Sequence, residues 1–201
     1  MYDRRMATPS ADITAFVLAG GKSTRMGKDK AFVVLDGRTL LDRMLELARS
    51  VAAEVRIVGD RAKFAAFAPV VEDIFPGCGP LGGIHAALRS SQTDLNLILA
   101  VDVPFVSAAF LEFLIARSRD SRATVTVVRT RDGFQPLCAI YWRAFADSAE
   151  KALREGHFKI DALFEQTQTE VIEEEKLVAA GFSLRIFRNL NTPEDVTAAG
   201  E

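Results

Sequence analysis

The sequence predicts an α/β fold, a Rossmann-like three-layer sandwich in one domain with a mainly parallel sheet. Short apolar runs alternate with helical patterns from residue 13 to about residue 118, which is typical of a sheet covered by helices on both faces. The run at residues 95–101 is apolar almost throughout, as a central parallel strand should be. The chain has 201 residues, 49% of them hydrophobic, which suffices for one sizeable core.

In the first half of the chain, each expected element has a local cause. Apolar residues spaced three and four apart after Thr39 predict an amphipathic helix over residues 40–51. Ser107 is a favourable N-cap for a helix that reaches about residue 117. The Pro/Gly-rich segment 76–83 opens another helix, which ends near residue 90. The apolar runs between these helices predict strands at residues 13–18, 55–58, 69–71 and 95–101.

The second half has a weaker pattern. Turn residues around Asp132 separate two expected strands, and Thr192 followed by Pro193 predicts a short closing helix at residues 193–199. Residues 1–11 are polar and lack the apolar region of a secretory signal, so we expect a disordered tail before a single domain of residues 12–201. The other expected strands are 123–128, 137–141, 169–172 and 185–187, and the other helices are 144–155 and 160–166.

Composition excludes several classes of protein. The net charge of −2 argues against a polybasic surface for nucleic acid or for a membrane, and no apolar stretch is long enough to span a bilayer. Cys78 and Cys138 lie far apart in the sequence and form no metal-binding or disulfide pattern. Two reduced thiols are typical of a cytoplasmic protein, and we expect that location.

A loop rich in glycine and cations follows the first expected strand. Residues 18–30 read LAGGKSTRMGKDK, and their spacing fits neither G-x-x-x-x-G-K-S/T nor G-x-G-x-x-G. Glycines let the backbone approach a ligand, and cations on such a loop suit a polyphosphate. The loop therefore predicts reaction at a phosphate of a nucleoside triphosphate; a solvated basic turn is the alternative. The cations are Lys22, Arg25, Lys28 and Lys30, of which Lys22 and Lys28 are expected to be solvated.

Carboxylates follow the ends of three expected strands. Asp102 precedes Val103-Pro104, where the backbone is held extended, and such a carboxylate could bind Mg²⁺ together with phosphate oxygens and water. Asp60 and Asp73 could accept hydrogen bonds from guanine or from ribose hydroxyls. For all three, the alternative is a residue that merely forms a turn.

The segment from Gly79 to Gly83 opens a helix, where free N–H groups favour an anion or the polar edge of a base. A tight start of the helix without any ligand is the alternative. His85, inside this helix, is expected to have a structural role or to face solvent rather than to act as a base.

The string at residues 18–30 resembles the signature L-A-G-G-x-S-x-R-M-G-x-D-K of the molybdenum cofactor guanylyltransferase family. The resemblance implies a nucleotidyltransferase-type fold, Mg²⁺ as cofactor held by Asp102, and Arg25, Lys30 and Asp102 as catalytic residues. Two positions depart from the family pattern, because Val101 replaces a cysteine and Asp60 replaces an asparagine. The implied nucleotide-binding residues are Leu18, Ala19, Gly20, Gly21, Lys30, Asp60, Asp73, Gly79, Pro80, Leu81 and Asp102.

Later segments match further elements of that family. Gln135-Pro136-Leu137 is similar to its H/Q-P-L element, and residues 189–193 are similar to its N-x-N-T-P element. By this resemblance the N-terminal half binds the nucleotide and the C-terminal half binds molybdopterin. The implied pterin-binding residues are Gln135, Pro136, Asn189 and Asn191.

The resemblance implies transfer of GMP from GTP to the terminal phosphate of molybdenum-molybdopterin, with pyrophosphate as the second product. The implied partners are these two substrates and the maturation proteins of molybdoenzymes. The alternatives are a molybdopterin cytidylyltransferase, a sugar-phosphate nucleotidyltransferase, and a carrier of the cofactor without catalytic activity. Gly20-Gly21 favours GTP over CTP, since the family's CTP-using members carry L-A-A-G there.

Overall fold

A mixed eight-stranded sheet forms the middle layer of the protein. The computed structural model describes residues 9–20, 29–188 and 190, and the elements and contacts below are those of these residues. The strand order is β10-β7-β9-β6-β1-β4-β5, with β8 paired to β7. The strands are β1 (Ser10–Leu18), β4 (Ala52–Val58), β5 (Val70–Val71), β6 (Leu95–Ala100), β7 (Val125–Thr130), β8 (Gly133–Phe134), β9 (Cys138–Trp142) and β10 (Thr169–Glu173).

Most strand pairs are parallel. β1 pairs in parallel with β4 and β6, β4 with β5, and β10 with β7, whereas β9 runs antiparallel to both β6 and β7. The expected mainly parallel sheet is confirmed. β8 also runs antiparallel to β7, because the short turn around residue 132 can only join antiparallel neighbours.

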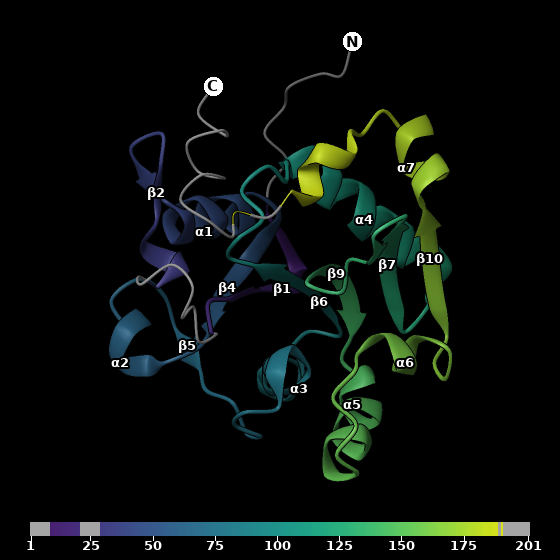
Figure 1. Cartoon of the computed structure of the whole chain (residues 1–201), viewed down its shortest axis with the longest axis horizontal. Helices are drawn as coiled ribbons and strands as arrows, with labels where there is room; N and C mark the ends of the chain where they lie inside the picture. The colour runs from purple at the N-terminus through teal and green to yellow at the C-terminus, as the bar shows by residue number, and fades with distance from the viewer. Residues whose placement is uncertain (1–8, 21–28, 189, 191–201) are drawn as a thin grey trace.

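Helices cover both faces of the sheet, as Figure 1 shows. One face carries α1 (Leu40–Val51), α4 (Ala108–Ser121) and α7 (Glu174–Ala179). The other face carries α3 (Gly79–Ser90), α5 (Phe145–Arg154) and α6 (Asp161–Phe164). The remaining elements are the 3-10 helices η1 (Lys30–Phe32) and η2 (Leu184–Phe187), the short helix α2 (Arg61–Phe64), and the hairpin of β2 (Val34–Leu35) and β3 (Arg38–Thr39).

The core consists of two apolar clusters, one on each face of the sheet. Side chains of a strand alternate between the faces, so Ala15 and Val17 of β1 lie in the cluster under α1 and α4, while Phe16 lies in the cluster under α3 and α5. Every residue of β6 is buried, as expected for a central strand covered on both sides.

Local capping explains why the helix starts could be predicted. The Thr39 side chain accepts a hydrogen bond from the Asp42 N–H at the start of α1, and the Ser107 side chain accepts one from the Phe110 N–H at the start of α4. The predicted cap at Ser107 is confirmed, and Thr39 caps α1 in the same way. The caps satisfy backbone donors that a helix leaves without partners in its first turn.

Two sequence-based predictions differ from the structure. The strand expected at residues 185–187 is wrong: these residues form η2, where the Ser183 hydroxyl accepts a hydrogen bond from the Arg185 N–H and Ile186 packs into the core. β1 already begins at Ser10, so Ser10 and Ala11 belong to the sheet rather than to the expected tail. The expected helix at residues 193–199 lies outside the described residues.

Both cysteines are free, in agreement with the prediction from their spacing. Burial raises the pKa of the Cys138 thiol to about 12, so it stays protonated at neutral pH. Across the part of the chain that the structure describes, no helix has the length and apolar character needed to cross a membrane.

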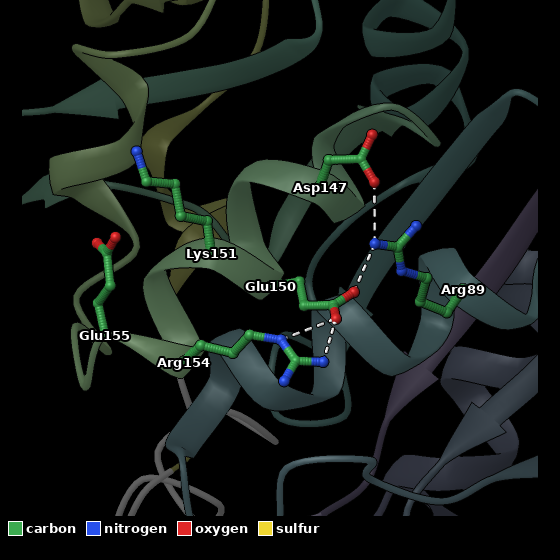
Figure 2. A pocket seen from close by; sticks show the side chains of 6 residues that line it. All are labelled: Arg89, Asp147, Glu150, Lys151, Arg154 and Glu155. Carbon is green, nitrogen blue, oxygen red and sulfur yellow. Dashed lines mark hydrogen bonds and ion pairs between the residues drawn. The ribbon is translucent and has the colours of Figure 1, made fainter.

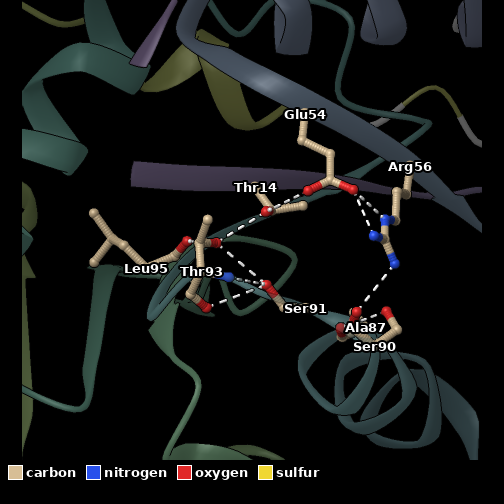
Figure 3. Close-up of polar contacts among 8 residues, drawn as sticks. All are labelled: Thr14, Glu54, Arg56, Ala87, Ser90, Ser91, Thr93 and Leu95. Carbon is tan, nitrogen blue, oxygen red and sulfur yellow. Dashed lines mark hydrogen bonds and ion pairs between the residues drawn. The ribbon is translucent and has the colours of Figure 1, made fainter. Parts of the chain in front are cut away.

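A buried polar network joins the strands near their amino ends (Figure 3). The hydroxyl of Thr14, fully buried on β1, lies 2.9 Å from the Thr93 hydroxyl and 3.4 Å from a Glu54 carboxylate oxygen. Glu54 also holds the guanidinium of Arg56, which donates to the Ser90 carbonyl at the end of α3. The network therefore connects β1, β4 and α3 at the amino ends of the strands, opposite their carboxyl ends.

We predict that Thr14→Val lowers the free energy of unfolding by about 1–3 kcal/mol, because the network loses a buried hydrogen-bonding group whose partners stay in place. Urea denaturation followed by circular dichroism measures the loss.

Thr126→Val on β7 is the matched control. Thr126 is also fully buried, but its hydroxyl has no hydrogen-bond partner among the described residues. Its removal should leave stability unchanged or raise it. Equal losses in both variants would show that the hydrogen bonds of Thr14 do not stabilise the fold.

Candidate active site

The parallel register brings the ends of three strands to one level. Leu18, the last residue of β1, pairs with Val58 of β4 on one side and with Ala100 of β6 on the other. The pairing continues beyond the strands, since the Ala19 N–H donates to the Val58 carbonyl at 3.0 Å and the Val101 N–H donates to the Leu18 carbonyl at 3.1 Å. The chain segments that leave these strands therefore start side by side, where ligands bind in open parallel sheets.

Two glycines face each other across this edge. A Cβ on Gly59 would come within 3.0 Å of the Phe64 ring and 3.5 Å of the Gly20 nitrogen, so the close packing of α2 requires glycine at position 59. A Cβ on Gly20 would meet nothing nearer than 3.9 Å, and Gly20 is exposed. The backbone at Gly20 is thus open to a ligand, while Leu18 and Ala19 lead into the core.

Lys30 and Asp102 form the charged centre of the site. The Lys30 Nζ lies 2.7 Å from Asp102 Oδ2, and the two side chains are only 21% and 20% exposed. Lys30 begins η1, and Asp102 follows β6 after Val101, so the pair joins segments that are far apart in the sequence. Partial exclusion of water strengthens such an ion pair relative to one on an open surface.

α2 supports the segment that carries Lys30. The Asp29 carboxylate caps η1 by accepting from the Ala31 N–H at 3.2 Å, and it also pairs with Lys63 Nζ of α2 at 3.1 Å. The ring of Phe32 stacks on Phe64 with centroids 5.8 Å apart. These supports were not predicted from the sequence. Asp before Lys30 is a visible N-cap signal, but no pattern in the sequence shows its contact with Lys63.

Asp60 has a local structural role. One of its carboxylate oxygens accepts a hydrogen bond from the Ala62 N–H at 2.8 Å and so caps α2. The residue is exposed at the carboxyl end of β4. The predicted turn-forming role is thus observed, and the expected nucleotide contact remains a prediction.

The Asp73 carboxylate lies beside Gly83 of α3. A Cβ on Gly83 would come 3.7 Å from Asp73 Oδ1, 3.6 Å from Leu18 Cδ2 and 3.4 Å from Val58 Cγ1, so the carboxylate approaches the ends of β1 and β4. Desolvation raises the pKa of the Asp73 carboxyl above its ordinary value. No hydrogen bond from the described residues reaches this carboxylate, which leaves it available to a donor on a ligand.

The start of α3 contributes backbone rather than side chains. Gly79 has a φ of 66°, which lets the chain turn sharply into the helix, and Pro80 follows it in the first turn. Leu81 is fully buried in the core under α3. Its side chain therefore serves packing, and its backbone is the part that can meet a ligand.

Residues from the second half of the chain reach the same edge. The Leu137 carbonyl accepts from the Ala100 N–H at 2.7 Å, which puts the segment with Gln135 and Pro136 beside the end of β6. The buried Leu190 donates its N–H to the Asp102 carbonyl at 3.2 Å. Gly21, Lys22, Arg25, Lys28, Asn189 and Asn191 lie outside the described residues.

The donor set at this edge suits a magnesium ion bound together with phosphate. Among the residues that the structure describes, no group of three or more His, Cys, Asp and Glu side chains could hold a metal. Magnesium needs only one or two carboxylates when phosphate oxygens and water supply its other ligands. The single carboxylate of Asp102, with a lysine beside it, fits that kind of site and does not fit a metal site built from protein alone.

Comparisons with known proteins agree with this geometry. The model of a family described as MobA-like NTP transferase domain matches residues 15–171. The chain is 35% identical over 190 residues to a molybdenum cofactor guanylyltransferase of Desulfosudis oleivorans, covering 93% of this chain and 94% of that relative. It is also similar to the crystal structure of molybdopterin-guanine dinucleotide biosynthesis protein A from Archaeoglobus fulgidus, with a TM-score of 0.81, 30% identity, and coverage of 93% and 96% of the two chains.

A more distant neighbour shares the fold. The 2-C-methyl-D-erythritol 4-phosphate cytidylyltransferase from Thermus thermophilus has a TM-score of 0.67 at 19% identity, with 92% of this chain and 96% of that chain covered. This chain therefore shares the arrangement of helices around a mainly parallel sheet with a cytidylyltransferase.

We predict that Asp73→Asn stabilises the protein at neutral pH. The raised pKa means that the folded state disfavours the carboxylate, a cost that is present above this pKa and vanishes below the ordinary value of 3.8. The variant should unfold at higher urea concentration than the wild type at pH 7, and the difference should shrink as the pH falls towards 3.8.

Asp12→Asn is the control with the opposite sign. A hydrogen bond from the Ser10 hydroxyl, together with the charge of Arg119, lowers the pKa of the Asp12 carboxyl. Its carboxylate stabilises the fold above pH 3.8, and this stabilisation is lost as the pH falls through the lowered pKa. This variant should therefore unfold at lower urea concentration at pH 7. A shift of both variants in the same direction would contradict the explanation for Asp73.

Proposed function

Because this chain belongs to the family of MobA-like NTP transferases and is a nucleotidyltransferase of molybdenum cofactor biosynthesis, we propose that it transfers GMP from GTP to molybdenum-molybdopterin. The terminal phosphate oxygen of the pterin forms a bond to the α-phosphorus of GTP. The bond from that phosphorus to the bridging oxygen breaks, and pyrophosphate leaves. The family resemblance of residues 18–30 is confirmed by the match of the family model.

The observation that carries this proposal is the ion pair of Lys30 and Asp102 at the strand ends. Phosphoryl transfer to an existing phosphate oxygen needs little proton chemistry, and it depends on alignment and on neutralisation of charge. In our proposal the Lys30 ammonium moves from Asp102 to the phosphates of GTP when the substrate binds. Arg25 adds a second cation that can contact two phosphate oxygens at once.

Asp102 is the residue that we assign to the Mg²⁺ of the reaction. Lys30 pairs with the Asp102 carboxylate, and the Leu190 N–H donates a hydrogen bond to the backbone carbonyl of Asp102. When bound, magnesium supplies positive charge that offsets the charge of phosphate oxygens. The mostly buried setting of the carboxylate limits competition from water.

The guanine nucleotide is expected along the carboxyl ends of the strands from β6 to β5. Leu18, Ala19, Gly20 and Gly21 form a backbone path beside the phosphates, and Gly79, Pro80 and Leu81 offer backbone groups at the start of α3. Asp73, without a hydrogen-bond partner among described residues, has the acceptor oxygens that the N1–H and amino group of guanine require. Asp60 is a further candidate for the ribose or the base.

The pterin is expected on the other side of Asp102. Gln135 and Pro136 follow β8 near the end of β6, and Leu190, which Asn189 and Asn191 flank in the sequence, is hydrogen-bonded to Asp102. Side-chain amides suit a heterocycle rich in donors and acceptors. We propose a cytoplasmic location, with GTP, molybdenum-molybdopterin and maturation proteins of molybdoenzymes as partners.

Two features favour this function over its alternatives. Gly20 leaves the backbone open where a larger residue would add a Cβ, which favours a purine nucleotide over CTP. The ion pair of Lys30 and Asp102 at the strand ends argues for chemistry at a phosphate and against a carrier that only passes the cofactor on. The likeness to a sugar-alcohol-phosphate cytidylyltransferase supports the shared fold and not the substrate.

The decisive experiment is a reaction with molybdopterin, molybdate, Mg²⁺ and one nucleotide at a time. We expect the guanine dinucleotide and pyrophosphate from GTP, and at most about a hundredth of that rate from CTP, which corresponds to a free-energy difference of about 2.7 kcal/mol. Equal turnover of GTP and CTP would contradict the assignment of GTP. Binding of the pterin without any pyrophosphate would identify a carrier instead of an enzyme.

Substitutions of the central ion pair test its chemical role. Lys30→Ala should lower kcat/KM for GTP by at least about 10²-fold, or about 2.7 kcal/mol, because a cation at the phosphates is lost. Asp102→Asn keeps the shape of the side chain and should remove most of the activity, with weaker dependence on Mg²⁺.

Lys176→Ala and Asp120→Asn are matched controls on α7 and α4. Both side chains are exposed and lie outside the segments that follow β1, β4 and β6. Rates near those of the wild type are expected for both. Near-normal rates for Asp102→Asn would show that this residue only shapes the turn.

A further inference from the structure

A charged cluster joins α3 to α5 on the face of the sheet opposite α1. It surrounds an open hollow of about 440 Å³ (Figure 2). Glu150 of α5 lies at its centre, with one carboxylate oxygen 2.6 Å from Arg89 Nη2 and the other 2.6 Å from Arg154 Nη2. These hydrogen bonds, first that from Arg154 and then that from Arg89, lower the pKa of Glu150 to about 2. The carboxylate is therefore charged at neutral pH and holds both arginines.

His85 of α3 lies beneath this cluster. The side chain is almost fully buried, and its Nε2 is 3.4 Å from the nearer Glu150 oxygen. Desolvation lowers the pKa of the imidazole, so the ring is neutral at pH 7. Its Nδ1 has no hydrogen-bond partner among the described residues. A neutral, buried ring fits the structural role expected from the sequence.

The ring of Phe75 packs against two residues of this cluster, His85 and Arg154. Its centroid is 5.2 Å from that of His85 in an edge-on arrangement, and the Arg154 guanidinium carbon lies 5.7 Å from it on the ring face. The Phe75 carbonyl is also close to α3, since a Cβ on Gly82 would come within 2.9 Å of the carbonyl oxygen. Side chain and backbone of Phe75 are thus both fixed against α3.

Asp73 precedes Phe75 by two residues in a segment that has no helix or strand. Ile74 between them is 57% exposed, so it does not anchor the segment in the core. The Asp73 carboxylate has no hydrogen bond from the described residues, although it lies only 3.7 Å from the position of a Cβ on Gly83. β5 and the ion pair of Glu72 with Arg61 fix the chain before Asp73, and the attachment of Phe75 fixes it on the other side.

We propose that Phe75, held by His85 and by the pair of Glu150 and Arg154, positions Asp73 and thereby sets the preference for the base of the nucleotide. This inference rests on the proposed function, in which Asp73 accepts hydrogen bonds from guanine. The position of a carboxylate that recognises a base by hydrogen bonds must be fixed to within a fraction of an ångström, because hydrogen bonds weaken quickly with distance and angle. In this proposal, helix α5 in the second half of the chain supports the contact of Asp73, in the first half, with the base.

The same geometry separates base recognition from the chemical step. Asp73 follows β5 and Asp102 follows β6, and the strands β4 and β1 lie between them in the sheet. Loss of the Phe75 anchor should therefore weaken binding of GTP and leave the alignment of Lys30 and Asp102 intact. A merely structural role would instead lower the stability without changing the choice of nucleotide.

The test compares Phe75→Leu and Glu150→Gln with the wild type. Both variants should raise the Kd and the KM for GTP about tenfold, reduce the preference for GTP over CTP by a similar factor, and leave kcat within about twofold. Phe75→Tyr keeps the ring and should restore the behaviour of the wild type. Isothermal titration with GTP and CTP measures binding, and pyrophosphate release measures turnover.

The chain offers a closely matched control at β8, on the same face of the sheet but away from β5. Phe134 makes an edge-on contact with Phe164 at 5.1 Å and lies 5.5 Å from the Arg129 guanidinium, which pairs with Glu173. Phe134→Leu and Glu173→Gln remove the same kinds of contact away from Asp73. Their Kd values for GTP and CTP should equal those of the wild type.

The outcomes distinguish this inference from the function on which it rests. Unchanged GTP and CTP affinities in the partly exposed variant Glu150→Gln would overturn the positioning role, even if Phe75→Leu failed to fold. An equal loss of GTP affinity in the Phe134 and Glu173 controls would overturn it as well. A wild-type protein that binds GTP no better than CTP would contradict the proposed function itself, and the inference with it.

Discussion

The parallel register of β4, β1 and β6 is the constraint on which the site depends. Because Leu18 is level with both Val58 and Ala100, three chain segments leave the sheet at the same edge. A shift of one strand by a single residue would turn its core side chains to the opposite face and would move Asp102 away from Lys30. The apolar clusters on the two faces prevent such a shift, so the packing of the core fixes the geometry of the charged groups.

Helices hold the site from outside the sheet on two sides. α2 fixes Lys30 through Asp29, Lys63 and the stacked ring of Phe32. α3 and α5 fix the segment of Asp73 through Phe75. Between these supports, Gly20 leaves room for a ligand. Rigid supports around an open backbone path are what a site for phosphate and base requires.

Much of the fold could be predicted because its signals are local. The caps of Thr39 and Ser107 and the apolar run of β6 depend on residues that are neighbours in the sequence. η2 was not predicted in this way. Its apolar residues are typical of a strand, but Ser183 caps a 3-10 turn there, and Ile186 of that turn packs into the core. α2 could not be predicted because four residues are too short for a helical pattern, and its stability comes from the burial of Phe64.

The sequence by itself determined which chemical groups follow each strand, and it therefore predicted that Gly20, Lys30 and Asp102 belong to a phosphate-handling site. Strand-end position and side-chain chemistry are properties of the chain that do not depend on distant contacts. Only the tertiary structure decided that Lys30 meets Asp102, that Asp29 meets Lys63, and that Phe75 meets His85 and Arg154. Such contacts join residues far apart in the sequence, and they follow from strand order and from the packing of helices on the sheet, which no local pattern encodes.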